Sequence, residues 1–184
     1  MHPPREKLSA ERISDLVEYY PRTGLFTWKA RADVARNWNT RHAGRPALIS
    51  VDGKGYLFGR IDYHMYRAHR VAWAAYYGEW PVNFIDHVDG DRKNNKIDNL
   101  RDVTHEQNCR NSAMRYTNTS GRIGISFDRR SSKWYAYIRV GGKMKNLGVF
   151  KARDDAIAAR ERAELEFGYH PNHGRLISTR SRLC

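Results

Sequence analysis

The sequence lacks several features that mark common classes of protein. None of its apolar runs approaches the roughly 18 residues that a membrane span needs, so we expect no spanning helix. Its first residues, MHPPREK, hold no apolar signal-peptide core, and we therefore expect the chain to stay in the cytosol. Cys109 and Cys184 are the two cysteines. They form no Cys-x-x-Cys pair for a structural zinc and do not suggest a disulfide framework.

Acidic residues are scarce compared with basic ones. The 184 residues include 33 Lys and Arg against 20 Asp and Glu, which gives a formal net charge of +13. Such a charge attracts polyanions, either nucleic acid or an anionic membrane surface, or it serves solubility alone. Residues 118–184 hold 14 Lys and Arg against 6 Asp and Glu, whereas residues 1–117 hold 19 against 14. The last third of the chain is therefore the more basic part.

The first half of the sequence alternates between helical and β-prone patterns. Helical spacing of apolar residues predicts one helix over residues 8–20 and another over 67–77, which Gly78 and Pro81 close. His69 lies in the second helix, and we interpret it as a partly buried structural histidine because no ligand partner is in sight. The remaining expectations are a strand over 25–28, a loop over 29–46 and a hairpin with strands 47–51 and 56–61.

The segment from Val82 to Asn108 combines residues that packing alone does not require. A strand over 82–85 leads into Asp86 and His87, and turn formers and charges predict a loop over 88–96. A helix begins after Thr104, whose capping box is completed by Gln107. A strand end, a loop and a helix start can bring Asp86, His87 and Asn108 together. This combination is typical of a metal-assisted site.

Three other interpretations of this segment compete with a metal-assisted site. A calcium loop with Gly90 at its sixth position would need its first ligand at Ile85, which has no carboxylate. A structural zinc site would need more ligands than His87 and His105. A polar surface loop without a role is the third alternative. The complete set, including Asn99 immediately before an apolar Leu100, favours a functional site.

The segment resembles the HNH, or ββα-metal, nucleases, in the subgroup of phage and intron-encoded homing endonucleases. The resemblance covers residues 67–111 and also includes the block His69-Arg70-Val71-Ala72-Trp73 and the turn Gly78-x-Trp80-Pro81. The positions that match in identity and spacing are Asp86-His87, Gly90, Asn95, Asn99-Leu100 and Asn108.

The resemblance implies a role for each of four residues. His87 would be the general base that activates water against a phosphodiester. Asp86 and Asn108 would hold one divalent cation, magnesium or manganese. Asn99 would orient His87 through a hydrogen bond. Where the family name implies a final histidine this chain has Asn108, which points to an oxygen-ligated metal.

The basic last third predicts a small sheet and one helix. After a linker at 118–121, alternating residues predict strands over 123–127, 134–140 and 146–150, arranged as an antiparallel meander. A helix over 154–167 would pack on one face of this sheet. On the middle strand Trp134, Ala136, Ile138 and Val140 share the packed face, and Tyr135, Tyr137 and Arg139 share the other.

Residues 118–169 resemble the ethylene-response-factor type of DNA-binding domain. The matching residues are Gly124-Ile125, Lys133-Trp134, Ile138-Arg139, Leu147-Gly148-x-Phe150 and the Ala-rich helix. The resemblance places Tyr137 and Arg139, together with Arg129 or Arg130 of the first turn, against DNA. Tyr135 shares the outer face with them, so we expect it to contact DNA as well. Lys143 and Lys145 would contact phosphates. Met144 and Asn146 depart from the family pattern, so the bases read would differ.

Together these patterns predict an α+β protein, in which a ββα-metal nuclease module is followed by a three-stranded antiparallel sheet packed on one helix. We expect an N-terminal helix and hairpin region (1–66), the nuclease module (67–117), the DNA-binding domain (118–169) and a basic tail (170–184). The predicted function is a monomeric, site-directed endonuclease in the cytoplasm of a bacterial host cell. It would nick double-stranded DNA before breaking both strands and would contact no membrane. The alternatives are a DNA-binding regulator without turnover and an RNA-binding protein.

Overall fold

The computed structural model describes residues 8–110, 114, 117–169, 171 and 173–174. The chain forms two compact units, Met1–His105 and Glu106–Cys184, each with helices and antiparallel sheet. This mixture confirms the predicted α+β class. Among the described helices none is both long and apolar enough to cross a membrane. Most of the predicted basic tail, 170–184, lies outside the described residues.

The first unit begins with a short helix and a hairpin. Helix α1 (Ala10–Leu16) starts at Ser9, whose side chain caps it. Strand β1 (Val17–Tyr20) then pairs antiparallel with β2 (Leu25–Trp28). The prediction of one helix over 8–20 is therefore wrong for its last four residues. Those residues are β-branched or aromatic for the most part, and pairing with a partner strand outweighs their helical spacing.

Helix α2 (Arg36–His42) lies inside the segment that we predicted as loop, which corrects that prediction. The helix buries none of its residues, so it has no apolar stripe that a sequence pattern could reveal. Trp38 sets its ring edge-on to Trp28, with 5.8 Å between ring centroids. This contact attaches the helix to the hairpin.

A three-stranded antiparallel sheet follows. The predicted hairpin is confirmed by β3 (Ser50–Val51) and β4 (Leu57–Ile61), and β5 (His64–Arg67) adds a third strand that we did not predict. Helix α3 (Ala68–Tyr77) follows β5 directly and ends at Gly78 in the left-handed conformation, as predicted.

The segment that carries the candidate site is a second hairpin with a long connection. Strand β6 (Phe84–His87) pairs antiparallel with β7 (Leu100–Val103), and a 3-10 turn, η1 (Ile97–Asn99), precedes β7. Helix α4 (His105–Arg110) starts one residue after Thr104, where the capping box predicts it. Strand β7 has only four residues, too few for alternation to mark it among charged neighbours.

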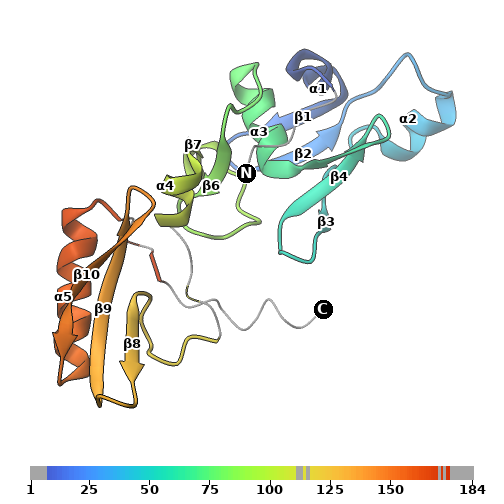
Figure 1. Ribbon diagram of the computed structural model, residues 1–184. Helices are drawn as coiled ribbons and strands as arrows, with labels where there is room; N and C mark the ends of the chain where they lie inside the picture. Colours follow the sequence, from blue (N-terminus) through green and yellow to red (C-terminus); the bar gives the residue numbers. More distant parts are fainter. Residues whose placement is uncertain (1–7, 111–113, 115–116, 170, 172, 175–184) are drawn as a thin grey trace. The chain divides into compact units, whose positions relative to one another are not determined.

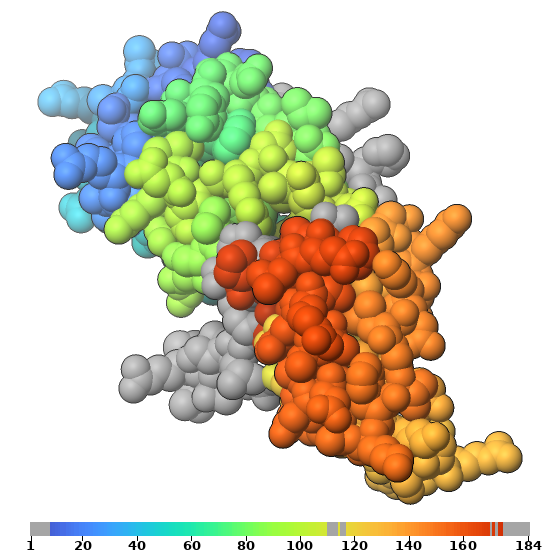
Figure 2. Space-filling view, turned by 90° about the vertical axis from the view of Figure 1, so that its left-hand side faces the viewer, coloured from blue at the N-terminus to red at the C-terminus, as the bar shows by residue number. Residues whose placement is uncertain are grey.

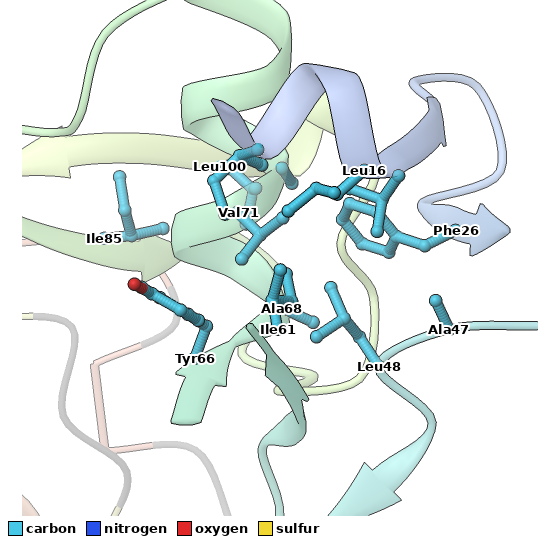
Figure 3. Packing of buried hydrophobic residues seen from close by; sticks show 13 residues of the cluster. Leu16, Phe26, Ala47, Leu48, Ile61, Tyr66, Ala68, Val71, Ile85 and Leu100 are labelled. Atoms are coloured by element: carbon cyan, nitrogen blue, oxygen red, sulfur yellow. The ribbon is translucent and has the colours of Figure 1, made fainter. Parts of the chain in front are cut away.

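One hydrophobic core holds the first unit together. Figure 3 shows Leu16, Phe26, Leu48, Val71 and Leu100 converging between α1, α3 and the hairpins. The core therefore joins residues on both sides of the domain boundary that we predicted at residue 66. In the space-filling view of Figure 2 the N-terminal segments (blue) and the segment around β6 and β7 (yellow-green) belong to one packed body.

The second unit has the predicted meander. Strands β8 (Ile125–Asp128), β9 (Lys133–Val140) and β10 (Lys143–Phe150) form a sheet with β9 in the centre, and α5 (Arg153–Glu166) runs along it (Figure 1). Ala136 of β9 is fully buried against α5, in a cluster with Ile125 and Ala156. Ile138 is buried as well, whereas Tyr137 and Arg139 are exposed. The predicted division of β9 into a packed and an outer face is thus confirmed.

Candidate nuclease site

The site is built on the β6 and β7 hairpin. In its register Asp86 pairs with Arg101, and His87 pairs with Leu100. Asp86 and His87 are both buried, with 8% and 3% of their surface exposed. The backbone N–H of Val88 donates to the carbonyl of Asn99 at 2.9 Å and so closes the connection between the strands. Two buried polar side chains at a strand end need partners, and the connecting loop provides one of them.

Asn95 is the loop residue that contacts His87. The Nε2 atom of His87 lies 3.2 Å from Oδ1 of Asn95, and only 1% of Asn95 is exposed. An amide oxygen can only accept, so Nε2 carries the hydrogen and Nδ1 carries the lone pair. Burial lowers the pKa of His87, although the Asn95 hydrogen bond and the carboxylates of Asp89, Asp86 and Asp91 act in the opposite direction. Burial thus favours the neutral imidazole, and in this tautomer Nδ1 is the nitrogen that can accept a proton.

Asn99 contacts the loop and not the imidazole, which differs from the hydrogen bond that we predicted. Its Nδ2 donates to Oδ1 of Asp89 at 2.9 Å and to the carbonyl of Asn94 at 2.8 Å, and its Oδ1 accepts from the backbone N–H of Asp89 at 3.0 Å. Burial alone would raise the pKa of Asp89, but hydrogen bonds from Asn94 and Asn99 hold it below its usual value. Asn99 thus braces both ends of the loop. Both asparagines belong to the matched pattern, and nothing in their spacing shows which one reaches His87.

The N-terminal hairpin supports the loop at Asn95. The hydroxyl of Tyr19 donates to the Asn95 carbonyl at 2.7 Å, and the backbone N–H of Ile97 donates to the Pro21 carbonyl at 3.2 Å. Gly24 approaches so closely that a Cβ there would lie 2.6 Å from the Asn95 carbonyl carbon. Sequence reasoning missed this support, because these residues lie some seventy positions before the loop.

Asp86, the predicted metal ligand, is held by Arg101. Its Oδ2 accepts from Nη2 of Arg101 at 2.6 Å and from Nε at 3.0 Å. A carboxylate and the Asn108 amide oxygen are donors that suit a hard cation, which retains several waters. The described residues contain no group of three or more His, Cys, Asp and Glu side chains that could enclose a metal. The Asp86 carboxylate is an oxygen donor, so its chemistry suits a divalent cation that prefers oxygen ligands better than a closed zinc site of Cys and His ligands. Asn108 lies on α4, in the second unit.

Two further rings lie against the imidazole of His87. His69 is 4% exposed and stands edge-on to His87, with 5.2 Å between ring centroids, and Tyr56 lies 5.9 Å from His87. Burial, and then the charges of His87, Arg67 and Arg70, hold the pKa of His69 well below its ordinary value. Among the described residues no partner bonds Nδ1 of His69. The imidazole of His87 thus packs against the rings of His69 and Tyr56.

The predicted DNA contacts of the second unit fall on two faces. Tyr135, Tyr137 and Arg139 lie on the outer face of β9, as predicted. Lys145 pairs with Ile138, so it lies on the helix side, where its ammonium stands 4.6 Å from the Phe167 ring centroid.

Lys143, Arg129 and Arg130 occupy the ends of this sheet. Lys143 pairs with Val140 and therefore shares the helix side with Lys145. Arg129 and Arg130 are exposed in the turn after β8, which Asp128 braces by accepting from the backbone N–H of Arg130 at 3.0 Å. The two lysines therefore do not extend the outer face.

Comparison with known proteins identifies the region of this site. Residues 66–110 match the family model of the HNH endonuclease. Protein 3.8 of Escherichia phage T7 is 35% identical over 89 residues, which span 48% of this chain and 71% of that protein. No solved structure matches the chain. The matched residues run from the end of β5 to the end of α4 and include every residue of the predicted catalytic and metal set.

Proposed function

The chain belongs to the family of phage T7 Protein 3.8 and carries an HNH endonuclease domain over residues 66–110, and on this premise we propose that it is a metal-dependent DNA endonuclease. The observation that carries the proposal is the buried His87, which follows the buried Asp86 on β6 and whose Nε2 lies 3.2 Å from Oδ1 of Asn95. A buried imidazole that is held in one tautomer suits a general base, and packing by itself does not require such an arrangement.

In the proposed mechanism Nδ1 of His87 accepts a proton from water as the water oxygen bonds to phosphorus. The phosphodiester bond on the opposite side breaks, and the leaving oxygen takes up a proton. Asn95 keeps the imidazole in the required tautomer, and Asn99 keeps the loop closed. Asp86 would hold a divalent cation, which would neutralise charge on the phosphate and on the leaving oxygen.

We further propose that the second unit lends specificity. A three-stranded sheet of this kind can enter a major groove, where arginines pair with guanine edges. The resemblance to ethylene-response-factor domains and the exposed Tyr137 and Arg139 support this proposal. The protein would act as a monomer on double-stranded DNA in the cytoplasm of a bacterial host. One active site per chain predicts that nicks precede double-strand breaks.

A supercoiled plasmid assay tests the proposal. The wild-type protein should convert supercoiled to nicked plasmid with magnesium or manganese and should lose this activity in EDTA. His87→Ala should reduce nicking by at least about a hundredfold, the usual range for a general base. An inactive wild type, or equal nicking by the variant, would contradict the nuclease proposal and favour a DNA-binding regulator.

A further inference from the structure

We propose that Tyr56, Arg67 and Arg92, which we call the Tyr56 cluster, bind backbone phosphates of the DNA strand beside the bond that is cut. The inference rests on the proposed nuclease function, since it assigns the substrate contacts of the same site. It concerns the first unit alone and adds three residues that sequence reasoning left without a role.

The Tyr56 cluster gathers two arginines from distant parts of the chain onto one ring. The Cζ atom of Arg67, at the end of β5, lies 4.6 Å from the Tyr56 ring centroid, and that of Arg92, in the loop after β6, lies 5.0 Å from it. Arg92 also donates from Nη1 to the Lys54 carbonyl. Stacking on an aromatic ring fixes the guanidinium plane and leaves its N–H groups along the edge, where a phosphate can bind bidentately.

The charge of the Tyr56 cluster is only partly compensated. Arg67 pairs with Asp52 at 3.1 Å, in a contact where 43% of the arginine side chain stays exposed. Arg92 is exposed and forms no ion pair with any of the described residues. Both guanidinium groups are positively charged, so each would attract an anion to its exposed edge.

Other arginines of the same unit are arranged differently. Arg12 and Arg31 share the carboxylates of Asp33 and Asp62, with contacts between 2.6 and 3.1 Å. That group balances two positive with two negative charges and serves structure. The Tyr56 cluster, with a single carboxylate for two arginines, retains a positive charge at the surface.

The Tyr56 cluster lies next to the proposed base. The Tyr56 ring is 5.9 Å from the His87 ring, so the Arg67 guanidinium is within about 11 Å of His87, close enough for both to face one short stretch of a DNA strand. Arg92 shares its loop with Asn95, which bonds His87. A phosphate bound by Arg92 would therefore also stabilise the conformation of the loop whose Asn95 orients His87.

Binding of a short DNA duplex to the full-length protein in EDTA tests the inference without any cleavage. Fluorescence anisotropy over a series of KCl concentrations gives the slope of log K against log [KCl]. Each of Arg67→Gln and Arg92→Gln should flatten this slope by about 0.9, and the double variant by about 1.8. Arg41→Gln, with the same charge change on the exposed surface of α2, is the matched control and should change the slope by much less.

Three outcomes would overturn the inference: an unchanged slope in the double variant, an equal flattening in Arg41→Gln, or a double Arg→Lys variant that behaves like the double Arg→Gln variant. Lysine keeps the positive charge, so the double Arg→Lys variant should recover most of the salt dependence that the double Arg→Gln variant loses. This comparison distinguishes a loss of phosphate contacts from a loss of folding. A failure of the nuclease proposal would instead appear in the plasmid assay, as nicking that persists in His87→Ala. The two proposals can therefore fail independently.

Discussion

The hydrogen bond between Asn95 and His87 can be tested by replacing the amide with a carboxylate of the same shape. Asn95→Asp keeps the side-chain volume in a site that is 1% exposed, and it places a negative charge where Oδ1 now stands, 3.2 Å from Nε2. An opposite charge at this distance raises a histidine pKa by about 1–3 units, because it stabilises the imidazolium. The pKa of His87, which burial lowers in the wild type, should rise accordingly.

The consequence for catalysis follows from the protonation state. Only the neutral imidazole accepts a proton, so activity requires a pH above the pKa of His87. The acidic limb of kcat/KM reports this pKa in the free enzyme and should move up by about 1–3 pH units. On the acidic side the variant would lose about tenfold in rate for each pH unit by which the limb moves. Above the displaced limb its rate should approach that of the wild type.

Nicking rates from pH 5 to 9 and the NMR titration of the His87 ring measure the same change in two ways. Asn37→Asp, which adds the same charge at an exposed position of α2, is the matched control. Asn99→Ala should lower the melting temperature and leave the limb in place, since Asn99 braces the loop. An unmoved limb in Asn95→Asp, or an equal displacement in the Asn37→Asp control, would refute the assigned contact.

Three other predictions follow from the surroundings of the site. Gly24→Ala should destabilise the protein by about 1–3 kcal/mol more than Gly44→Ala in urea unfolding, because both glycines have φ of 75° but only Gly24 meets backbone atoms, at 2.6 Å. Equal losses of stability in Gly24→Ala and Gly44→Ala would contradict the contact of Gly24 with the loop at Asn95. The lowered pKa of His69 keeps it neutral in the folded state while the unfolded chain binds a proton below about pH 6.5, so stability should fall with falling pH by up to about 1.4 kcal/mol per pH unit. His69→Leu should weaken this dependence between pH 7 and 5, and an unchanged dependence would contradict the assignment. Asp86→Asn should weaken manganese binding measured by calorimetry and abolish nicking, and wild-type affinity in this variant would exclude Asp86 as a ligand.

The sequence by itself determined the parts of this protein whose signal is local. Alternation along β9 separated Ala136 and Ile138 from Tyr137 and Arg139, because burial on one face of a strand repeats every second residue. Gly78 marked the end of α3, since the left-handed conformation favours glycine. The spaced set from Asp86-His87 to Asn108 carried the resemblance to HNH nucleases, and the match of residues 66–110 to the HNH endonuclease supports that interpretation.

Only the tertiary structure decided which side chains meet. The sequence offered Asn99 as the partner of His87, and the loop instead turns Asn95 inward, where Tyr19 holds its carbonyl from 76 positions away. No periodicity encodes a contact of that kind, because it depends on how separate elements pack on one core. For the same reason only the structure shows that the two arginines of the Tyr56 cluster, 25 positions apart in the sequence, meet on one ring beside His87.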